Sequence, residues 1–279
     1  STSSVQTISY SDTISDYVGT VTTDNPLAMG VYFARANSNG VPVKAVRVGS
    51  DNSTGYSTAL DALSEREDIY GIVPMAFDAT IQSLVQSHVN TMSNAEVGKW
   101  RVGWFSTQLV TEEAVLDTDS DGDAYTATIT GASNTLLEGD SLNLITAGVQ
   151  AGDIVRTNYS VQDSYEEYVI ESVDTEDSCT LVSGPSSPIS VAQKIEVWHP
   201  KTKNEQAQYI ATKSGAFGSR RIRNVWPDVA YNGGTSYNGY YVAAALSGLR
   251  SGVRANQGLT NVELTGFDDL TRTYEYFTS

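Results

Sequence analysis

Cysteine is almost absent from this sequence, and its scarcity excludes a class of folds. Cys179 is the only cysteine among 279 residues, so an internal disulfide framework is excluded and the chain suits a reducing compartment. Histidine is also scarce, with His88 and His199 alone, and no group of Cys and His has the spacing of a zinc site. We expect His88 to be a packed core residue and place His199 at a domain junction. The sequence therefore offers no transition-metal centre.

Long apolar runs and nucleotide-binding loops are missing as well. No stretch is long and apolar enough to cross a bilayer, and no charged-then-apolar leader is visible, so we expect neither a membrane span nor a signal peptide. Neither Gly-x-x-x-x-Gly-Lys-Ser/Thr nor Gly-x-Gly-x-x-Gly occurs, and no Gly-x-Ser-x-Gly turn presents a serine for attack. We predict no cofactor and no catalytic residue.

Basic residues are few, and their distribution divides the chain. There are 17 Lys and Arg against 33 Asp and Glu, which gives a net charge of −16. Residues 107–200 hold 17 of the acids but only Arg156 and Lys194, a net charge of −15, so the remainder carries about −1. A near-neutral part can stack against copies of itself, whereas a strongly anionic part repels its neighbours and belongs in solvent.

The first hundred residues show alternating helix and strand signals. The expected strands are 41–48, 69–73 and 100–105, and the expected helices are 27–36 after an Asn25-Pro26 start, a second capped by Ser57 or Thr58, and a third capped by Asp78. Residues 1–24 are read as an edge strand or a loose lead-in. Short connections between such elements predict an α+β or α/β fold with a mixed sheet covered by helices.

The pattern changes between residues 107 and 200. Six short alternating runs are separated by Gly, Asp and Ser, at 125–130, 142–145, 154–157, 168–173, 179–182 and 195–198. Such runs predict a small antiparallel β-barrel or β-sandwich. A polar helix at 204–213 leads back to the first pattern. We therefore expect a discontinuous core domain, 1–106 plus 201–279, with an acidic inserted β domain at 107–200.

A small-residue helix at 239–250 follows a basic, aromatic segment at 220–228. The helix is apolar on almost every side, which predicts that it is buried, and at about a dozen residues it is too short to span a membrane. A short apolar strand is expected at 262–264.

Three sequence blocks stand out in this region: Arg-Arg-Ile-Arg-Asn-Val-Trp-Pro-Asp at 220–228, Gly-Tyr-Tyr-Val-Ala-Ala-Ala-Leu-Ser-Gly-Leu-Arg-Ser-Gly at 239–252 and Gln-Gly-Leu-Thr-Asn-Val-Glu-Leu-Thr-Gly at 257–266. In this order they resemble the contractile tail sheath proteins of bacteriophages. An earlier block fits too, with Asp-Ile-Tyr-Gly-Ile-Val-Pro at 68–74, His88-Val89, Met92-Ser93 and Gly-Lys-Trp-Arg at 98–101. The likeness covers about 26–105 and 201–266, and the acidic domain lies outside it.

The resemblance implies a structural subunit rather than an enzyme. Sheath subunits stack helically around an inner tail tube and contract to drive it through the host envelope, with energy stored in subunit contacts. Its implied partners are other sheath subunits, the inner tail tube protein and the baseplate, in a virion tail assembled in the host cytoplasm. Family members hold their neighbours through terminal arms that add strands to a shared sheet. The chain begins at Ser1 and ends at Ser279 with little room for such arms, so we expect a trimmed piece that is a soluble monomer, with its acidic domain on the outer surface.

The sharpest ligand motif is acidic. Asp117, Asp119, Asp121 and Asp123 alternate as in the first half of a calcium loop, where carboxylates converge on one ion. The twelfth position is Thr128 instead of a bidentate Glu, and the flanks read as strands, so an acidic hairpin loop is the favoured interpretation. A calcium-dependent surface or adhesion module built on the acidic domain remains the alternative function.

The basic segment carries the candidates for subunit contacts. Arg220, Arg221, Arg223 and Trp226 form a small basic and aromatic footprint, for which an ion pair with a neighbouring copy is favoured over nucleic acid. An enzyme that uses the carboxyl ends of the strands, near Gly49 and Pro74, is the remaining alternative. It would need a deep pocket with converging polar groups at that edge.

Overall fold

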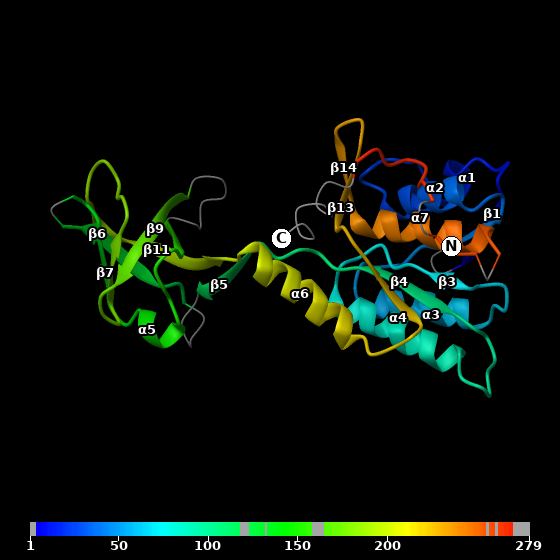
Figure 1. The fold of residues 1–279 in the computed structure, drawn as a ribbon, viewed down its shortest axis with the longest axis horizontal. Coiled ribbons are helices and arrows are strands. Elements are labelled where there is room, and N and C mark those ends of the chain that lie inside the picture. The colour runs from blue at the N-terminus through cyan, green and yellow to red at the C-terminus, as the bar shows by residue number, and fades with distance from the viewer. Residues whose placement is uncertain are drawn as a thin grey trace. The chain divides into compact units, whose positions relative to one another are not determined.

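The computed structural model describes residues 4–117, 123–131, 133–157, 165–254, 257–259 and 262–269 (Figure 1). The chain divides into two compact units, which we name the core unit (Ser1–Leu109 and Ala207–Ser279) and the barrel unit (Val110–Gln206). The fold is a mixed α/β structure with several sheets and a closed antiparallel β-barrel, as the sequence pattern predicts.

A three-stranded parallel sheet lies at the centre of the core unit. Its order is β12 (Ile222–Val225), β4 (Val102–Ser106) and β3 (Gly71–Ile72). All five residues of β4 are buried. Trp104 packs into the cluster on one face of the sheet and Phe105 into the cluster on the other. A strand buried on both faces is typical of a parallel sheet that helices cover on both sides.

Three helices cover this sheet. On the Trp104 face lies α7 (Gly239–Gly252), and on the Phe105 face lie α3 (Ser53–Ser64) and α4 (Ala79–Met92). The Asp78 cap of α4 is confirmed, because its Oδ1 accepts a hydrogen bond from the N–H of Ile81 at 2.9 Å. The predicted cap of α3 is wrong.

The cap of α3 lies five residues before Ser57 and six before Thr58. Asn52 Oδ1 accepts from the N–H of Gly55 at 3.0 Å, and the helix starts at Ser53. Asparagine in extended backbone is among the best capping residues, so the helix begins after Asn52 instead of after Ser57 or Thr58.

The buried helix α7 packs directly against α2 (Pro26–Asn37), which Asn25 caps. The prediction that α7 is buried is confirmed for nearly all of its first ten residues. A Cβ on Gly248 would lie 2.1 Å from the carbonyl oxygen of Ala34, and one on Gly252 would lie 2.4 Å from that of Ser38. The small residues of α7 therefore allow the two helix backbones to touch.

A separate two-stranded sheet lies beside α2. In it β1 (Val5–Ile8) pairs antiparallel with β2 (Val43–Val46). The strand predicted at 41–48 is thus present, but it does not join the parallel sheet, because its hydrogen-bonding partner is the N-terminal segment. Between them the chain forms the short helix α1 (Ser15–Val18), and Ile14 joins the small core under α2.

The segment around residue 230 is more regular than the sequence indicates, and the one around 263 is less so. A hairpin of β13 (Val229–Asn232) and β14 (Thr235–Asn238) connects the basic segment to α7, and the sequence argument did not predict it. The predicted strand at 262–264 is wrong. The Asn37 side chain takes the place of a strand partner there, accepting from the N–H of Thr265 at 2.8 Å and donating to its carbonyl at 3.1 Å.

The barrel unit is a closed six-stranded antiparallel barrel with one added strand. Around the barrel the order is β11-β6-β7-β10-β9-β8 and back to β11, and β5 pairs with the far end of β11. The strands are β5 (Glu112–Leu116), β6 (Thr126–Thr130), β7 (Leu136–Gly139), β8 (Ile154–Thr157), β9 (Glu166–Val173), β10 (Ser178–Leu181) and β11 (Ile189–Pro200). Helix α6 (Lys203–Ala216) follows β11.

One predicted strand of the barrel is a helix. The run at 142–145 forms no strand, because its last two residues begin α5 (Leu144–Ala147), and the sequence missed β5 and β7. Asn143 has a left-handed backbone with φ of 57°, which ends extended structure, while Leu142 and Leu144 are fully buried in the barrel core. Burial also raises the pKa of Cys179 to about 12, so the thiol is inert at neutral pH.

None of the helices in the described ranges has the length and apolar character that crossing a bilayer requires.

The two histidines lie in opposite electrostatic settings. His88 on α4 contacts the fully buried Arg101, whose Nη2 donates to the carbonyls of Leu63 and Arg66 at the end of α3 at 2.8 and 2.7 Å. Since a guanidinium only donates, His88 Nε2 must accept, which requires a neutral ring. Burial and the Arg101 charge lower the pKa of His88 to about 4.

His199 in the barrel unit is held by acids instead. Its Nδ1 lies 2.6 Å from Oδ1 of the buried Asp153, and its Nε2 lies 3.7 Å from Glu205. The hydrogen bond to Asp153 raises the pKa of His199 above its ordinary value. Thr202 and Glu205 form a capping box at the start of α6, so His199 connects the barrel to that cap.

Replacing Gly248 with Ala should destabilise the core unit by about 1–3 kcal/mol, because the new methyl group meets the carbonyl oxygen of Ala34. The matched control is Gly215→Ala in α6, where a Cβ meets nothing within 4 Å and stability should hold or rise slightly. Denaturant unfolding monitored by circular dichroism measures both. Equal stability of the two variants would contradict the close helix contact.

Acid should change the stabilising contributions of the two histidines in opposite directions. Because the pKa of His88 is depressed, its contribution to the free energy of unfolding is lost as pH falls from about 6.5 toward about 4. The contribution of protonated His199 is complete below about pH 6.5 and is lost as pH rises through its raised pKa. The variant His88→Gln keeps an acceptor for Arg101 but cannot titrate, so its stability should fall less between pH 6.5 and pH 4 than that of the parent. NMR titration of the two imidazoles checks the assignment, which an ordinary pKa for His88 would refute.

Candidate functional site

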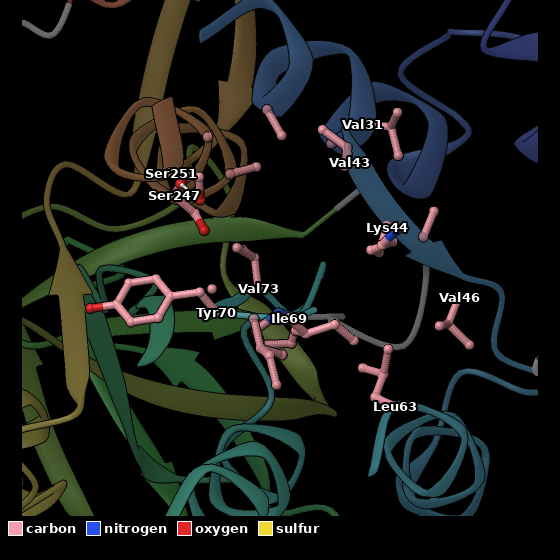
Figure 2. A pocket seen from close by; sticks show the side chains of 18 of the residues that line it. Val31, Val43, Lys44, Val46, Leu63, Ile69, Tyr70, Val73, Ser247 and Ser251 are labelled. Atoms are coloured by element: carbon pink, nitrogen blue, oxygen red, sulfur yellow. Dashed lines mark hydrogen bonds between the residues drawn. The ribbon is translucent and has the colours of Figure 1, made fainter. Parts of the chain in front are cut away.

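A pocket of the core unit lies between the β1–β2 sheet and the parallel sheet. It has a volume of about 550 Å³ and is lined by α2, β2, α3, the residues around β3, and α7. Figure 2 shows Val43 and Val46 of β2 across this groove from Ile69 and Val73, which flank β3. Most of the lining side chains are aliphatic. The groove therefore favours an apolar occupant.

Both strands that flank the groove have an edge without a sheet partner. In the described part of the chain, β2 pairs only with β1 and β3 pairs only with β4. The helices α2 and α7 lie on one side of this strand layer, and α3 and α4 lie on the other (Figure 1). The groove thus lies between the unpaired edges of β2 and β3, within the layer that the helices cover. Open strand edges beside an apolar groove are suited to binding an extended peptide, since main-chain hydrogen bonds and side-chain burial are both available.

A charged contact spans the groove from one sheet to the other. Lys44 Nζ on β2 lies 3.0 Å from Oδ2 of Asp68, which comes just before β3, and Arg66 binds the same carboxylate through two nitrogens at 2.9 and 2.7 Å. The hydrogen bonds from Arg66 and Lys44 hold the pKa of Asp68 well below its usual range. The contact links β2 to the segment before β3 although the two strands are not paired.

A second hollow, of about 500 Å³, lies at the carboxyl ends of β2 and β3. Its polar lining includes Asn52 and Asp78, which already cap α3 and α4 through hydrogen bonds to backbone N–H groups. Asn238 Nδ2 donates to the hydroxyl of Tyr240 at 2.6 Å. Burial and Asp51 raise the pKa of Tyr56 to about 12, so this phenol stays protonated. These contacts assign structural roles to the polar groups at the edge where an enzyme site was considered.

The basic segment is divided between the two ends of β12. Arg220 and Arg221 come just before the strand, Arg223 is in it, and Trp226 follows its last residue. The aromatic partner of Arg221 is Trp100, whose ring centre lies 4.6 Å from the guanidinium carbon. The sequence argument missed this pairing, although an isolated tryptophan in the polar stretch 98–101 is a signal for it. In the part of the chain that is described, none of the three arginines pairs with a carboxylate.

The acidic motif joins two strands that are not neighbours. Asp117 follows β5, Asp123 precedes β6, and both strands pair with β11 instead of with each other. The favoured interpretation as a hairpin loop is therefore wrong. Thr128, at the twelfth position, lies within β6, and its hydroxyl donates to the carbonyl of Glu138 at 3.3 Å. Asp119 and Asp121 lie outside the described residues.

The groove should bind an apolar fluorescent dye in the folded protein. Val46→Trp places a large side chain at the groove and should reduce the dye's fluorescence, whereas Val191→Trp on β11, where the valine is 74% exposed, should leave it unchanged. Dye titration of the parent and both variants measures the effect. Equal dye binding by all three proteins would show that the groove does not accept an apolar ligand.

Comparison with known proteins adds no relative to this description. No protein-family model matches the chain, and no curated protein is significantly similar to it. The case for a function therefore depends on the groove, on the arginines, and on the resemblance of the two sequence blocks.

Proposed function

We propose that this protein is a structural subunit of the contractile tail sheath of a bacteriophage. It polymerises around the inner tail tube, and its contraction drives that tube through the host envelope. Its partners are other sheath subunits, the inner tail tube protein and the baseplate, in a virion tail that is assembled in the host cytoplasm. It acts as a scaffold without a cofactor and not as an enzyme.

The observation that carries the proposal is the apolar groove between the unpaired edges of β2 and β3 in the core unit. In this proposal an extended segment of a neighbouring copy enters the groove and pairs with the open edges of β2 and β3. Strand addition gives many main-chain hydrogen bonds in a fixed register, which suits a contact that must survive while the subunits move. A small apolar ligand would fill the volume but would leave the strand edges unpaired.

The distribution of charge supports the same proposal. Outside residues 107–200 the chain carries a net charge of about −1, so copies of the core unit can stack without strong repulsion. Most of the anionic barrel unit is then best placed toward solvent in an assembly. Its fully buried core, with Leu137, Ile170 and Ile195, folds around itself and requires no partner for burial.

Electron microscopy of the complete gene product tests the proposal. We expect hollow striated tubes from the parent protein. Val46→Glu places a charge at the groove and should prevent tube formation while leaving a folded subunit, because burying an unpaired carboxylate is costly. Val191→Glu is the matched control on an exposed strand of the barrel and should assemble normally.

Two results would contradict the proposal. One is a complete gene product that forms no tube or ring under any assembly condition. The other is normal tubes from Val46→Glu, which would exclude the groove as the point of attachment.

A further inference from the structure

Three arginines near the start of β12 form no ion pair with the acidic residues that the structure describes. Arg220 and Arg223 are exposed and Arg221 is half-buried, and none of them makes an ion pair with any residue in the described ranges. Arg66, by contrast, holds the carboxylate of Asp68 with two nitrogens. Acids outnumber bases by 33 to 17, so a cluster of unmatched arginines indicates a surface kept for another molecule.

These arginines are held in a fixed arrangement. Arg221 stacks on Trp100, whose side chain is 53% exposed, and Arg223 Nη1 donates to the carbonyl of Arg220 at 2.8 Å. The parallel pairing of Ile222 with Gly103 sets the two segments side by side. We name Trp100, Arg220, Arg221 and Arg223 the arginine platform. Exposed tryptophan and arginine are enriched at binding surfaces, and a stacked guanidinium loses little freedom when it binds a carboxylate.

The barrel unit carries the complementary charge. It has 18 acidic and 4 basic residues between Val110 and Gln206, a net charge of −14. Four acids gather where the end of β7 meets the turn between β9 and β10: Glu138, Asp140, Asp174 and Asp177, which we name the acidic rim. The pairing of Ser178 with Glu138 and the hydrogen bond from the N–H of Gly139 to the carbonyl of Asp177 bring these segments together.

The rim contains acids with two different tasks. Asp177 accepts from the N–H of Leu142 at 2.8 Å, and Asp174 accepts from the hydroxyl of Thr180 at 2.8 Å, so both stabilise the barrel. The side chains of Glu138 and Asp140 are exposed. Exposed carboxylates on a rigid strand end can meet arginines without first breaking contacts of the barrel.

We propose that the arginine platform of one copy binds the acidic rim of a second copy. The inference rests on the proposed function, because it names the surfaces through which neighbouring subunits of that assembly recognise each other. The two surfaces differ, so the contact is heterologous and repeats from copy to copy, as a ring or helix requires. Its charge complementarity predicts association that is fast at low salt and weakened at high salt.

A charge-reversal cycle on the complete gene product tests the pairing. The platform variant carries Arg220→Glu and Arg223→Glu, and it spares Arg221 because that side chain packs on Trp100. The rim variant carries Glu138→Arg and Asp140→Arg. The control variant, with Lys213→Glu and Arg254→Glu, makes the same charge change at exposed positions outside the platform. Sedimentation velocity at low and high salt measures self-association, and circular dichroism checks that each variant is folded.

We expect the platform and rim variants each to raise the dissociation constant roughly tenfold at low salt, and the combined variant to recover at least part of that loss. The control variant should associate like the parent. Unchanged association of the platform variant, or failure of the combined variant to recover, would overturn the pairing. Two further results would overturn it: self-association of the parent protein that does not depend on salt, and a platform variant that loses heparin binding while its self-association is unchanged. The second result would identify a polyanion as the partner. A failed charge cycle in a protein that still forms tubes contradicts this inference alone, whereas a working cycle without tubes contradicts the proposed function.

Discussion

The open backbone edges of β2 and β3 are the constraint on which this account depends. Peptide N–H and C=O groups must be paired with protein or with water, and strand edges that face an apolar groove satisfy this demand poorly when the groove is empty. The groove lies between these two edges in a core whose helices cover both sides of the strands. A single copy of the chain therefore presents backbone groups that an added polypeptide segment can pair.

Contacts on several sides of the groove define its walls. The far edge of β2 is occupied by β1, and Lys44 reaches across to Asp68 next to β3. On one side the small residues of α7 let α2 approach to backbone contact, so these two helices form a firm wall. The space is thus fixed by contacts around it, and an occupant would enter a preformed site at little cost in ordering.

Sequence reasoning recovered the elements with strong local signals and missed those that depend on distant partners. The caps Asn25 and Asp78, the buried α7 and the inserted barrel follow from local chemistry and from periodicity, and the structure bears them out. The groove could not be predicted, because the strand at 41–48 reads the same whether it pairs with β3 or with the N-terminal segment. The pairing of Trp100 with Arg221 was missed for a similar reason: it links residues far apart in the chain through the parallel register of β4 and β12.

The most direct test of the groove is backbone hydrogen exchange, measured residue by residue in the free subunit and in the assembled state. The account predicts that the amides of Val43–Val46 that face away from β1, together with those of Gly71–Ile72, exchange readily in the free subunit and become strongly protected on assembly. The amides of the central strand β4, already buried and paired, serve as the internal reference. Exchange at β2 and β3 that is the same in both states would contradict the claim that a strand from another copy fills the groove.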